Sequence, residues 1–375
     1  MQAILLTTKK QLKKFINLPF SLYKEDEFFV PQISSDLFKT LNKLCLVDKT
    51  YKALAVVDDN GNFLARLLFT ISYSKQLKLD KCGFFSHFEC INDSACAKLI
   101  LDKMCEMLSG EGVTHVEGTY FPFDQDNRRG IQVCGFEDQP MIFTSYNPPY
   151  YQTLLEENGF KKDFDTVSYK HSYDEYDYER VEKVKERLYK QSDLYISKVD
   201  FKNLDSEIKD VHQIMLEATN EIIFQQAPSL EDIRSIVEGW KSFLWEDLIL
   251  IARRKSDNYP VGMVMAIPNF YYVFRKMKGK TTLPALLKLL YYKNKITSMR
   301  IMLQYVIPSY QNRGTNFLLY HELYRYSKAR GITYVESGTI MENNMQSRIN
   351  VEKAGGKLNK IFRIYGKQLW VFKQY

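Results

Sequence analysis

The chain has 375 residues, a formal net charge of +7, 45% hydrophobic residues and 26% charged ones. These values are typical of a soluble globular protein and exclude a disordered or fibrous chain. The length predicts two domains, each large enough to bury its own core. The 26 tyrosines and 24 phenylalanines favour a sheet-rich mixed fold over a helix bundle.

Cysteine, histidine and apolar patterns narrow the class further. All six cysteines lie in the first half without a Cys-x-x-Cys pair, which predicts reduced and mostly buried thiols. The five histidines show no metal-binding spacing, so we expect no metal. No stretch approaches the roughly 18 apolar residues that cross a bilayer, and the N-terminus does not resemble a leader peptide. We therefore expect a cytoplasmic protein with no membrane span and, lacking a recognised reading motif, no nucleic-acid partner.

In chain order, the first half begins with a strand pair over 54–69 around an Asp-Asn-Gly turn. Residues 121–140 are predicted to be an insertion. The segment 173–193 is dense in charge and helical in pattern, which indicates a linker helix. We therefore predict a first domain over 1–172, a charged linker helix over 173–192 and a second domain over 193–375.

The second half continues with a predicted strand pair over 248–253 and 261–268. The aromatic cluster over 270–274 favours core over an acceptor pocket. An inserted segment over 276–295 contains an apolar run, 283–290, and the lysines 276, 278, 280, 288, 293 and 295. A solvated face is the ordinary interpretation of such lysines. Binding to a cofactor phosphate, a membrane surface or nucleic acid are the alternatives.

Residues 306–316 read Val-Ile-Pro-Ser-Tyr-Gln-Asn-Arg-Gly-Thr-Asn. An apolar strand precedes them, Pro308 ends it, and apolar residues recur at helical spacing from Phe317 onwards. Residues 311–316 therefore lie at a helix N-terminus, where unpaired N–H groups and the helix dipole attract anions. Gly314 lets the backbone approach such a ligand closely. The pattern predicts a pyrophosphate-binding turn.

A Gln-x-x-Gly-x-(Gly/Ala) turn after a Val-x-Pro strand end resembles motif A of the GNAT acetyltransferase superfamily. The strand at 331–336, two asparagines and the segment 349–356 are similar to the next part of that family, so the resemblance covers about 193–375. It implies coenzyme A or acetyl-coenzyme A as the ligand. The implied cofactor-binding residues are Val306, Ile307, Gln311, Asn312, Arg313, Gly314, Thr315, Asn316, Asn343 and Asn344. For Asn343 and Asn344, capping of the following helix is an equal alternative.

The chain also resembles itself. Residues 155–161 parallel 351–357, and residues 112–117 parallel 331–336. The shift in residue number that aligns 112–117 with 331–336 also places 92–97 over 311–316. There Asp93 adds a negative charge and Ala95 replaces Gly314. We therefore predict an α/β fold with a mixed α+β sheet, built of two tandem GNAT-like domains. The first would be a degenerate copy without the pyrophosphate turn.

The resemblance implies an N-acyltransferase that moves acetyl from acetyl-coenzyme A to a primary amine, by direct attack in a ternary complex. The acceptor would be a small molecule or a peptide, and the sequence leaves room for a homo-oligomer. Glu336 is the candidate base and Glu221 a weaker one, although Glu336 has a counterpart, Glu117, that favours a structural role equally. Val351 replaces the tyrosine that protonates the leaving thiolate in the family, so the acid is Tyr305, Tyr365, solvent or absent. The alternative function is a non-catalytic acyl-coenzyme A-binding or regulatory protein.

Overall fold

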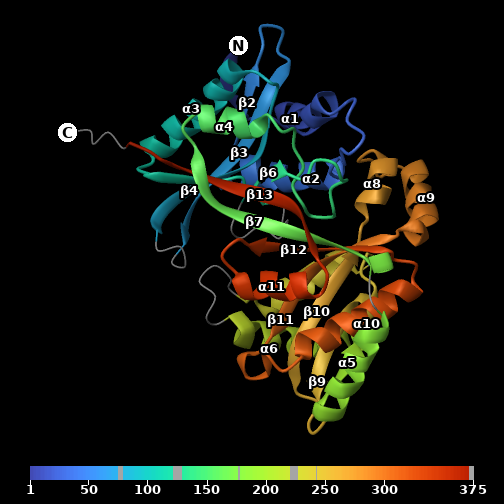
Figure 1. Cartoon of the computed structure of the whole chain (residues 1–375). Helices are drawn as coiled ribbons and strands as arrows, with labels where there is room; N and C mark the ends of the chain where they lie inside the picture. Colours follow the sequence, from blue (N-terminus) through green and yellow to red (C-terminus); the bar gives the residue numbers. More distant parts are fainter. Residues whose placement is uncertain (75–78, 121–128, 176–177, 220–226, 242, 371–375) are drawn as a thin grey trace.

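The computed structural model describes residues 1–74, 79–120, 129–175, 178–219, 227–241 and 243–370. Within them, one mixed sheet of 13 strands is covered by α-helices (Figure 1). The strands are β1 (Gln2–Leu5), β2 (Tyr51–Val57), β3 (Phe63–Ser74), β4 (Leu79–Cys90), β5 (His115–Gly118), β6 (Ile131–Cys134), β7 (Lys161–Ser172), β8 (Leu194–Lys198), β9 (Ile249–Arg254), β10 (Pro260–Pro268), β11 (Ser298–Val306), β12 (Tyr334–Met341) and β13 (Lys357–Gln368). The helices are α1 (Lys9–Leu22), α2 (Ser34–Leu41), α3 (Ser94–Gly110), α4 (Tyr151–Glu157), α5 (Tyr178–Gln191), α6 (Leu204–Thr219), α7 (Leu230–Trp240), α8 (Tyr271–Met277), α9 (Leu283–Tyr292), α10 (Thr315–Ala329) and α11 (Met345–Lys353).

The first half of the sheet separates two cores because side chains alternate across a strand. Along β2, Ala53 and Ala55 contact the core beneath α1 and α2, whereas Leu54 and Val56 contact the core beneath α3 and α4. The β2–β3 pair is antiparallel, and β4 and β5 run parallel. The strand pair predicted over 54–69 is confirmed by β2 and β3.

The second half repeats this arrangement. β9 and β10 form the antiparallel pair predicted over 248–268, β10 pairs with β11, and β11 runs parallel to β12. The aromatic cluster over 270–274 forms α8, and its Phe270, Val273 and Phe274 are buried in the second-half core. Among the described helices, none is both long and apolar enough to cross a bilayer.

The two halves exchange their last strands. β13, the last strand of the chain, lies between β5 and β7, and β7 in turn pairs with β12 of the second half. In Figure 1, red β13 therefore crosses among the blue and green strands, and green β7 continues the sheet toward β12. Each half-sheet is completed by the other half's final strand.

Side-chain contacts follow the same exchange. Tyr169 of β7 donates to Glu352 of α11 at 2.7 Å, and Tyr365 of β13 donates to Glu156 of α4 at 3.0 Å. Both residue types repeat at the offset that relates 155–161 to 351–357. The two contacts are equivalent, so the repeat seen in the sequence is also a repeat of geometry.

A first-half loop completes the second-half core. Ile142 is fully buried in that core, and its N–H donates to Asn269 Oδ1 at 3.1 Å. The buried Arg300 of β11 donates to the Ile142 carbonyl at 2.7 Å. The division into 1–172 and 193–375 stays a prediction, and α5 lies within the segment predicted as the linker helix.

Candidate functional site

The parallel strands β11 and β12 separate partway along their length. They pair only from Ser298–Tyr334 to Ile301–Ser337, although β11 continues to Val306 and β12 to Met341. Opposite β10, the register shifts so that Met302 has no partner residue, which is a β-bulge at the point of separation. On the side of β11 away from β10, main-chain groups beyond this point face a gap instead of a neighbouring strand.

A cavity of about 2550 Å³ occupies this gap. Its walls include Gln304 and Tyr305 of β11, Thr339 and Ile340 of β12, and residues of α7 and α9. It is larger than the roughly 300–1,000 Å³ that is usual for a small-molecule site. The space accommodates a ligand longer than a nucleotide.

The predicted pyrophosphate turn opens into this cavity. Gly314 has φ of 82° and precedes the first residue of α10 without a side-chain cap. The turn is held by its own side chains: Thr315 Oγ1 donates to the Tyr310 carbonyl at 3.0 Å, and Gln311 Nε2 donates to the Val306 carbonyl at 3.1 Å. Gln311 and Thr315 therefore shape the turn through contacts inside the protein.

The main-chain donors of the turn are open. Within the part of the chain that the structure describes, the N–H groups of residues 312–317 donate to no protein acceptor. Asn316 Oδ1 is likewise buried without a hydrogen-bond partner among the described residues. No Asp or Glu occurs in the sequence between Asp257 and Glu322, so the segment that contains the turn carries no acidic side chain. These features fit a bound pyrophosphate.

The equivalent helix of the first half is closed. Asp93 caps α3, and its carboxylate accepts from the Cys96 N–H at 2.8 Å. A negative side chain thus occupies the position that a phosphate would take, because both bind the same helix-terminal donors. That the first half binds no pyrophosphate stays a prediction.

The predicted cofactor residues divide by their position. Those that line the cavity are Val306, Gln311, Asn312, Gly314, Thr315, Asn316 and Asn344. Asn344 also caps α11 by accepting from the Ser347 N–H at 3.1 Å. Ile307, Arg313 and Asn343 are not among the lining residues, and the Arg313 guanidinium lies over the Tyr310 ring at 5.4 Å.

The pairing of β10 with β11 fixes which main-chain groups face the gap. The Ile307 N–H donates to the Val261 carbonyl at 3.0 Å, so Ile307 is directed toward β10. Since main-chain groups alternate sides along a strand, those of Tyr305 also face β10, and those of Gln304 and Val306 face the gap. Gln304 is a residue that the sequence prediction missed.

Glu336 does not line the cavity. Its side chain is fully buried, and Glu336 Oε2 accepts from Lys360 Nζ at 3.0 Å and from Asn359 Nδ2 at 3.1 Å. Lys360 is also fully buried and donates to the Gln139 carbonyl at 3.1 Å. A buried and paired carboxylate outside the cavity fits the structural alternative better than a base for the acceptor amine. Glu221, the weaker candidate, lies outside the described residues.

The two tyrosine candidates for the leaving-group acid lie in different places, and only one of them lines the cavity. Tyr305 lines the cavity, and burial raises the pKa of its phenol, against the opposing charge of Arg129. Tyr365 is buried in the first-half core and bonded to Glu156, away from the cavity lining. Val351 lines the cavity as an apolar wall. Tyr305 is therefore the tyrosine that the geometry favours.

The structure adds His171, a cavity residue that the sequence analysis did not select. His171 Nε2 lies 3.2 Å from Ser337 Oγ, and Ser337 is the last residue of β12 that pairs with β11. Burial lowers the pKa of His171 to about 4, so the imidazole is neutral near pH 7. It comes from β7 of the first half, and only the strand exchange brings it to the narrow end of the gap.

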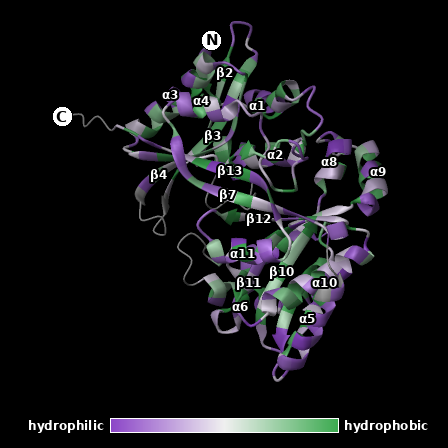
Figure 2. Ribbon diagram, in the orientation of Figure 1, coloured by the Kyte–Doolittle hydropathy of each residue, from purple (hydrophilic) through white to green (hydrophobic). Residues whose placement is uncertain are grey.

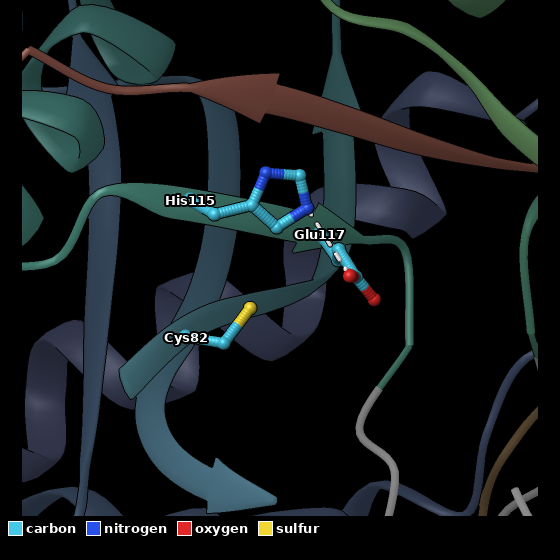
Figure 3. Close-up of side chains that lie close together, drawn as sticks. All are labelled: Cys82, His115 and Glu117. Atoms are coloured by element: carbon cyan, nitrogen blue, oxygen red, sulfur yellow. Dashed lines mark hydrogen bonds and ion pairs between the residues drawn. The ribbon is translucent and has the colours of Figure 1, made fainter. Parts of the chain in front are cut away.

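A second polar cluster lies in the first half. Cys82 of β4 and His115 and Glu117 of β5 place their ligand atoms within 4.8 Å of one another (Figure 3). Such a set can hold a metal ion, and the sequence spacing gave no signal of it. Glu117, however, already contacts His115 Nε2 at 3.1 Å and accepts from Tyr120 at 2.6 Å, and burial raises the pKa of the Cys82 thiol. Contacts inside the protein therefore account for this cluster.

Comparison with known proteins agrees with this geometry. No family model matches the chain. A bacterial ceramide synthase from Caulobacter vibrioides is 23% identical over 377 residues, covering 96% of each chain. The glucosamine N-acetyltransferase region of a fungal β-N-acetylglucosaminidase is 13% identical with a TM-score of 0.60, covering 98% of this chain and 38% of that one.

A tandem GNAT protein from the clavulanic acid biosynthesis pathway is 9% identical with a TM-score of 0.55, covering 98% of both chains. At these identities the likeness of the solved structures concerns the fold. The tandem arrangement named for that protein agrees with the repeat described above. The chain therefore has the fold of the GNAT acetyltransferases, in a tandem arrangement, as the sequence predicted.

Proposed function

We propose that this protein transfers an acyl group from acyl-coenzyme A to a primary amine. One observation carries the proposal: the open main-chain donors at the start of α10 and the gap between β11 and β12 belong to the same cavity. The first would hold the pyrophosphate, and the second would admit the pantetheine arm. The thioester supplies an activated acyl carbon for attack by the amine.

The size of the cavity favours a long substrate over the acetyl group that the sequence resemblance implies. About 2550 Å³ exceeds what an acetyl group and a small amine require, and many wall residues are apolar, including Met265, Phe274, Leu289 and Leu303. The relative named as a ceramide synthase supports the same direction, because a ceramide is a long-chain amine carrying an acyl group. We infer that the acceptor is a long-chain primary amine and the acyl group a long one.

The residues of the chain have limited tasks in this reaction. Acyl transfer requires positioning, a neutral amine and a destination for the proton that the amine loses. Tyr305, kept protonated by its raised pKa, would donate a hydrogen bond toward the departing sulfur. His171 would position the Ser337 hydroxyl at the narrow end of the gap, since its Nε2 lies 3.2 Å from Ser337 Oγ. The proton that the amine loses would end on the departing sulfur, which leaves as the coenzyme A thiol.

A second function, binding of acyl-coenzyme A without turnover, is favoured by Val351 at the family's acid position. Calorimetry with coenzyme A, acetyl-coenzyme A and palmitoyl-coenzyme A, followed by thiol release with short- and long-chain amines, separates the two. We expect the tightest binding with palmitoyl-coenzyme A and release only with long-chain amines. Binding without release by any amine would support the second function, and absence of binding would remove both.

A further inference from the structure

Helix α9 exposes an unusual amount of apolar surface. Its sequence is Leu-Pro-Ala-Leu-Leu-Lys-Leu-Leu-Tyr-Tyr, and the exposed fractions are 71% for Leu283, 59% for Leu287, 59% for Leu290 and 61% for Tyr291. Only Ala285 is buried. Figure 1 shows α9 beside α8 at the periphery of the molecule, and in Figure 2 green patches mark its hydrophobic residues.

The pattern of α9 differs from that of an ordinary surface helix. Such a helix turns one apolar stripe inward and charged residues outward, whereas a helix that is apolar all round is usually buried in protein or lipid. Here Ala285 and Leu289 face the protein, and leucines also cover the outer side. The single charged residue of the helix, Lys288, folds back to donate to the Lys276 carbonyl at 3.1 Å. The outer face is therefore left to a partner.

The charge around α9 indicates what that partner is. Residues 271–297 contain seven basic residues and no acidic one, so the segment accounts for the whole net charge of +7. Lys278, Lys280 and Lys295 are exposed beside the leucines. Lys295 Nζ lies 3.8 Å from the centre of the Tyr291 ring, which places a cation next to an amphipathic aromatic residue. Leucines bordered by lysines and tyrosines are typical of helices that lie in the interface of an anionic bilayer.

The cavity extends beneath this helix. Leu286 and Leu289, on the inner side of α9, line the same cavity as Gly314 and Tyr305, and so do Met277 of α8 and Pro31 of the first half. The pyrophosphate turn and α9 thus border the same cavity. A long-chain molecule entering beside α9 would meet apolar walls before it reaches the gap between β11 and β12.

We propose that α9 binds the surface of an anionic membrane and that the long-chain amine enters the cavity from that membrane. The leucines and Tyr291 would insert among the acyl chains, and the lysines would contact the anionic headgroups. This proposal rests on the proposed function for the identity of the substrate. The membrane contact itself is measurable without any reaction.

The test uses the full chain and vesicles of phosphatidylcholine, alone or with 30% phosphatidylglycerol, in flotation assays. We expect binding to the anionic vesicles that is stronger than to the neutral ones and weakens as salt rises. Leu287→Glu with Leu290→Glu should lower vesicle binding at least tenfold, because both leucines are exposed on α9. Neither residue lines the cavity, so the substitutions leave the cavity walls unchanged. The matched control is Leu5→Glu with Leu99→Glu, two exposed leucines outside α9, and it should bind as the unchanged chain does.

Activity provides the second measurement. The α9 variant should act at the unchanged rate on a long-chain amine delivered as a water-soluble cyclodextrin complex and at least tenfold more slowly on the same amine presented in vesicles. Equal vesicle binding by the α9 variant and the unchanged chain would overturn the proposal. Two other results would also overturn it: no binding to anionic vesicles, or conversion of a dimer to a monomer by the α9 substitutions without lipid, which would make α9 a contact between copies.

Discussion

The buried pair of Glu336 and Lys360 provides the sharpest test of the roles assigned above. Both side chains are fully buried and their charged atoms lie 3.0 Å apart. Removing one partner of such a pair leaves an uncompensated charge and costs about 3–5 kcal/mol, whereas removing both charges is often nearly neutral. We expect Glu336→Gln and Lys360→Met each to lower the free energy of unfolding by about 3–5 kcal/mol. The double variant should be more stable than either single variant, so the two single losses should be strongly non-additive.

Urea unfolding followed by circular dichroism measures these free energies, and thiol release per folded molecule measures activity. The matched control is Lys357→Met on the same strand, whose ion pair with Glu175 is exposed and should contribute less than about 1 kcal/mol. If Glu336 only supports the fold, the double variant keeps its activity to within about threefold. A stable double variant whose activity falls by a factor of about 100 or more would refute this reasoning and make Glu336 the base.

Three further predictions concern the cavity. Gly314→Ala should weaken coenzyme A binding in calorimetry at least tenfold, because Gly314 lines the cavity at the turn and an added methyl would occupy space beside the ligand, whereas Gly331→Ala, with a similar φ away from the cavity lining, should not; equal affinities for both variants would contradict this. Tyr305→Phe should lower turnover by about 10- to 100-fold with unchanged unfolding, and an unchanged rate would remove the phenol from the mechanism. Because burial lowers the pKa of His171 to about 4 from an unfolded value near 6.5, the unfolded chain binds more protons between these values, and stability should fall as pH drops through that range, by up to about 3 kcal/mol. His171→Gln should remove this part of the pH dependence in urea unfolding, and a curve parallel to that of the unchanged chain would speak against it.

The sequence predicted the parts of the site that depend on local pattern. The turn at Gly314 follows from a strand, a proline and a helical repeat within about twenty residues, all of which a single sequence displays. Asp93 could be placed over the equivalent turn because the repeat aligns it. Open donors in one half and a capping carboxylate in the other are the direct consequence of these local sequences.

The parts that were missed depend on contacts between distant segments. Lys360 resembles any surface lysine in the sequence, and only the pairing of β13 with β7 buries it beside Glu336. His171 belongs to the first half by sequence and reaches the cavity because β7 pairs with β12. The sequence favours a solvated face for the lysines near α9 and leaves a membrane surface as an alternative, because the exposure of the neighbouring leucines is visible only in the folded chain.

The exchange of β7 and β13 makes the first half part of the candidate site in the second half. Had each half kept its last strand, the second half could bind its substrate alone, and the first would be free to diverge or be lost. Instead β7 forms one side of the second-half sheet and carries His171 and Tyr169, which contact Ser337 and Glu352 across the boundary. β13 makes the equivalent contact in the first half, where its Tyr365 donates to Glu156. Since β7 lies between β12 and β13, and β13 pairs in turn with β5 and β6, a change that loosens the first-half sheet should also displace His171 at the narrow end of the gap.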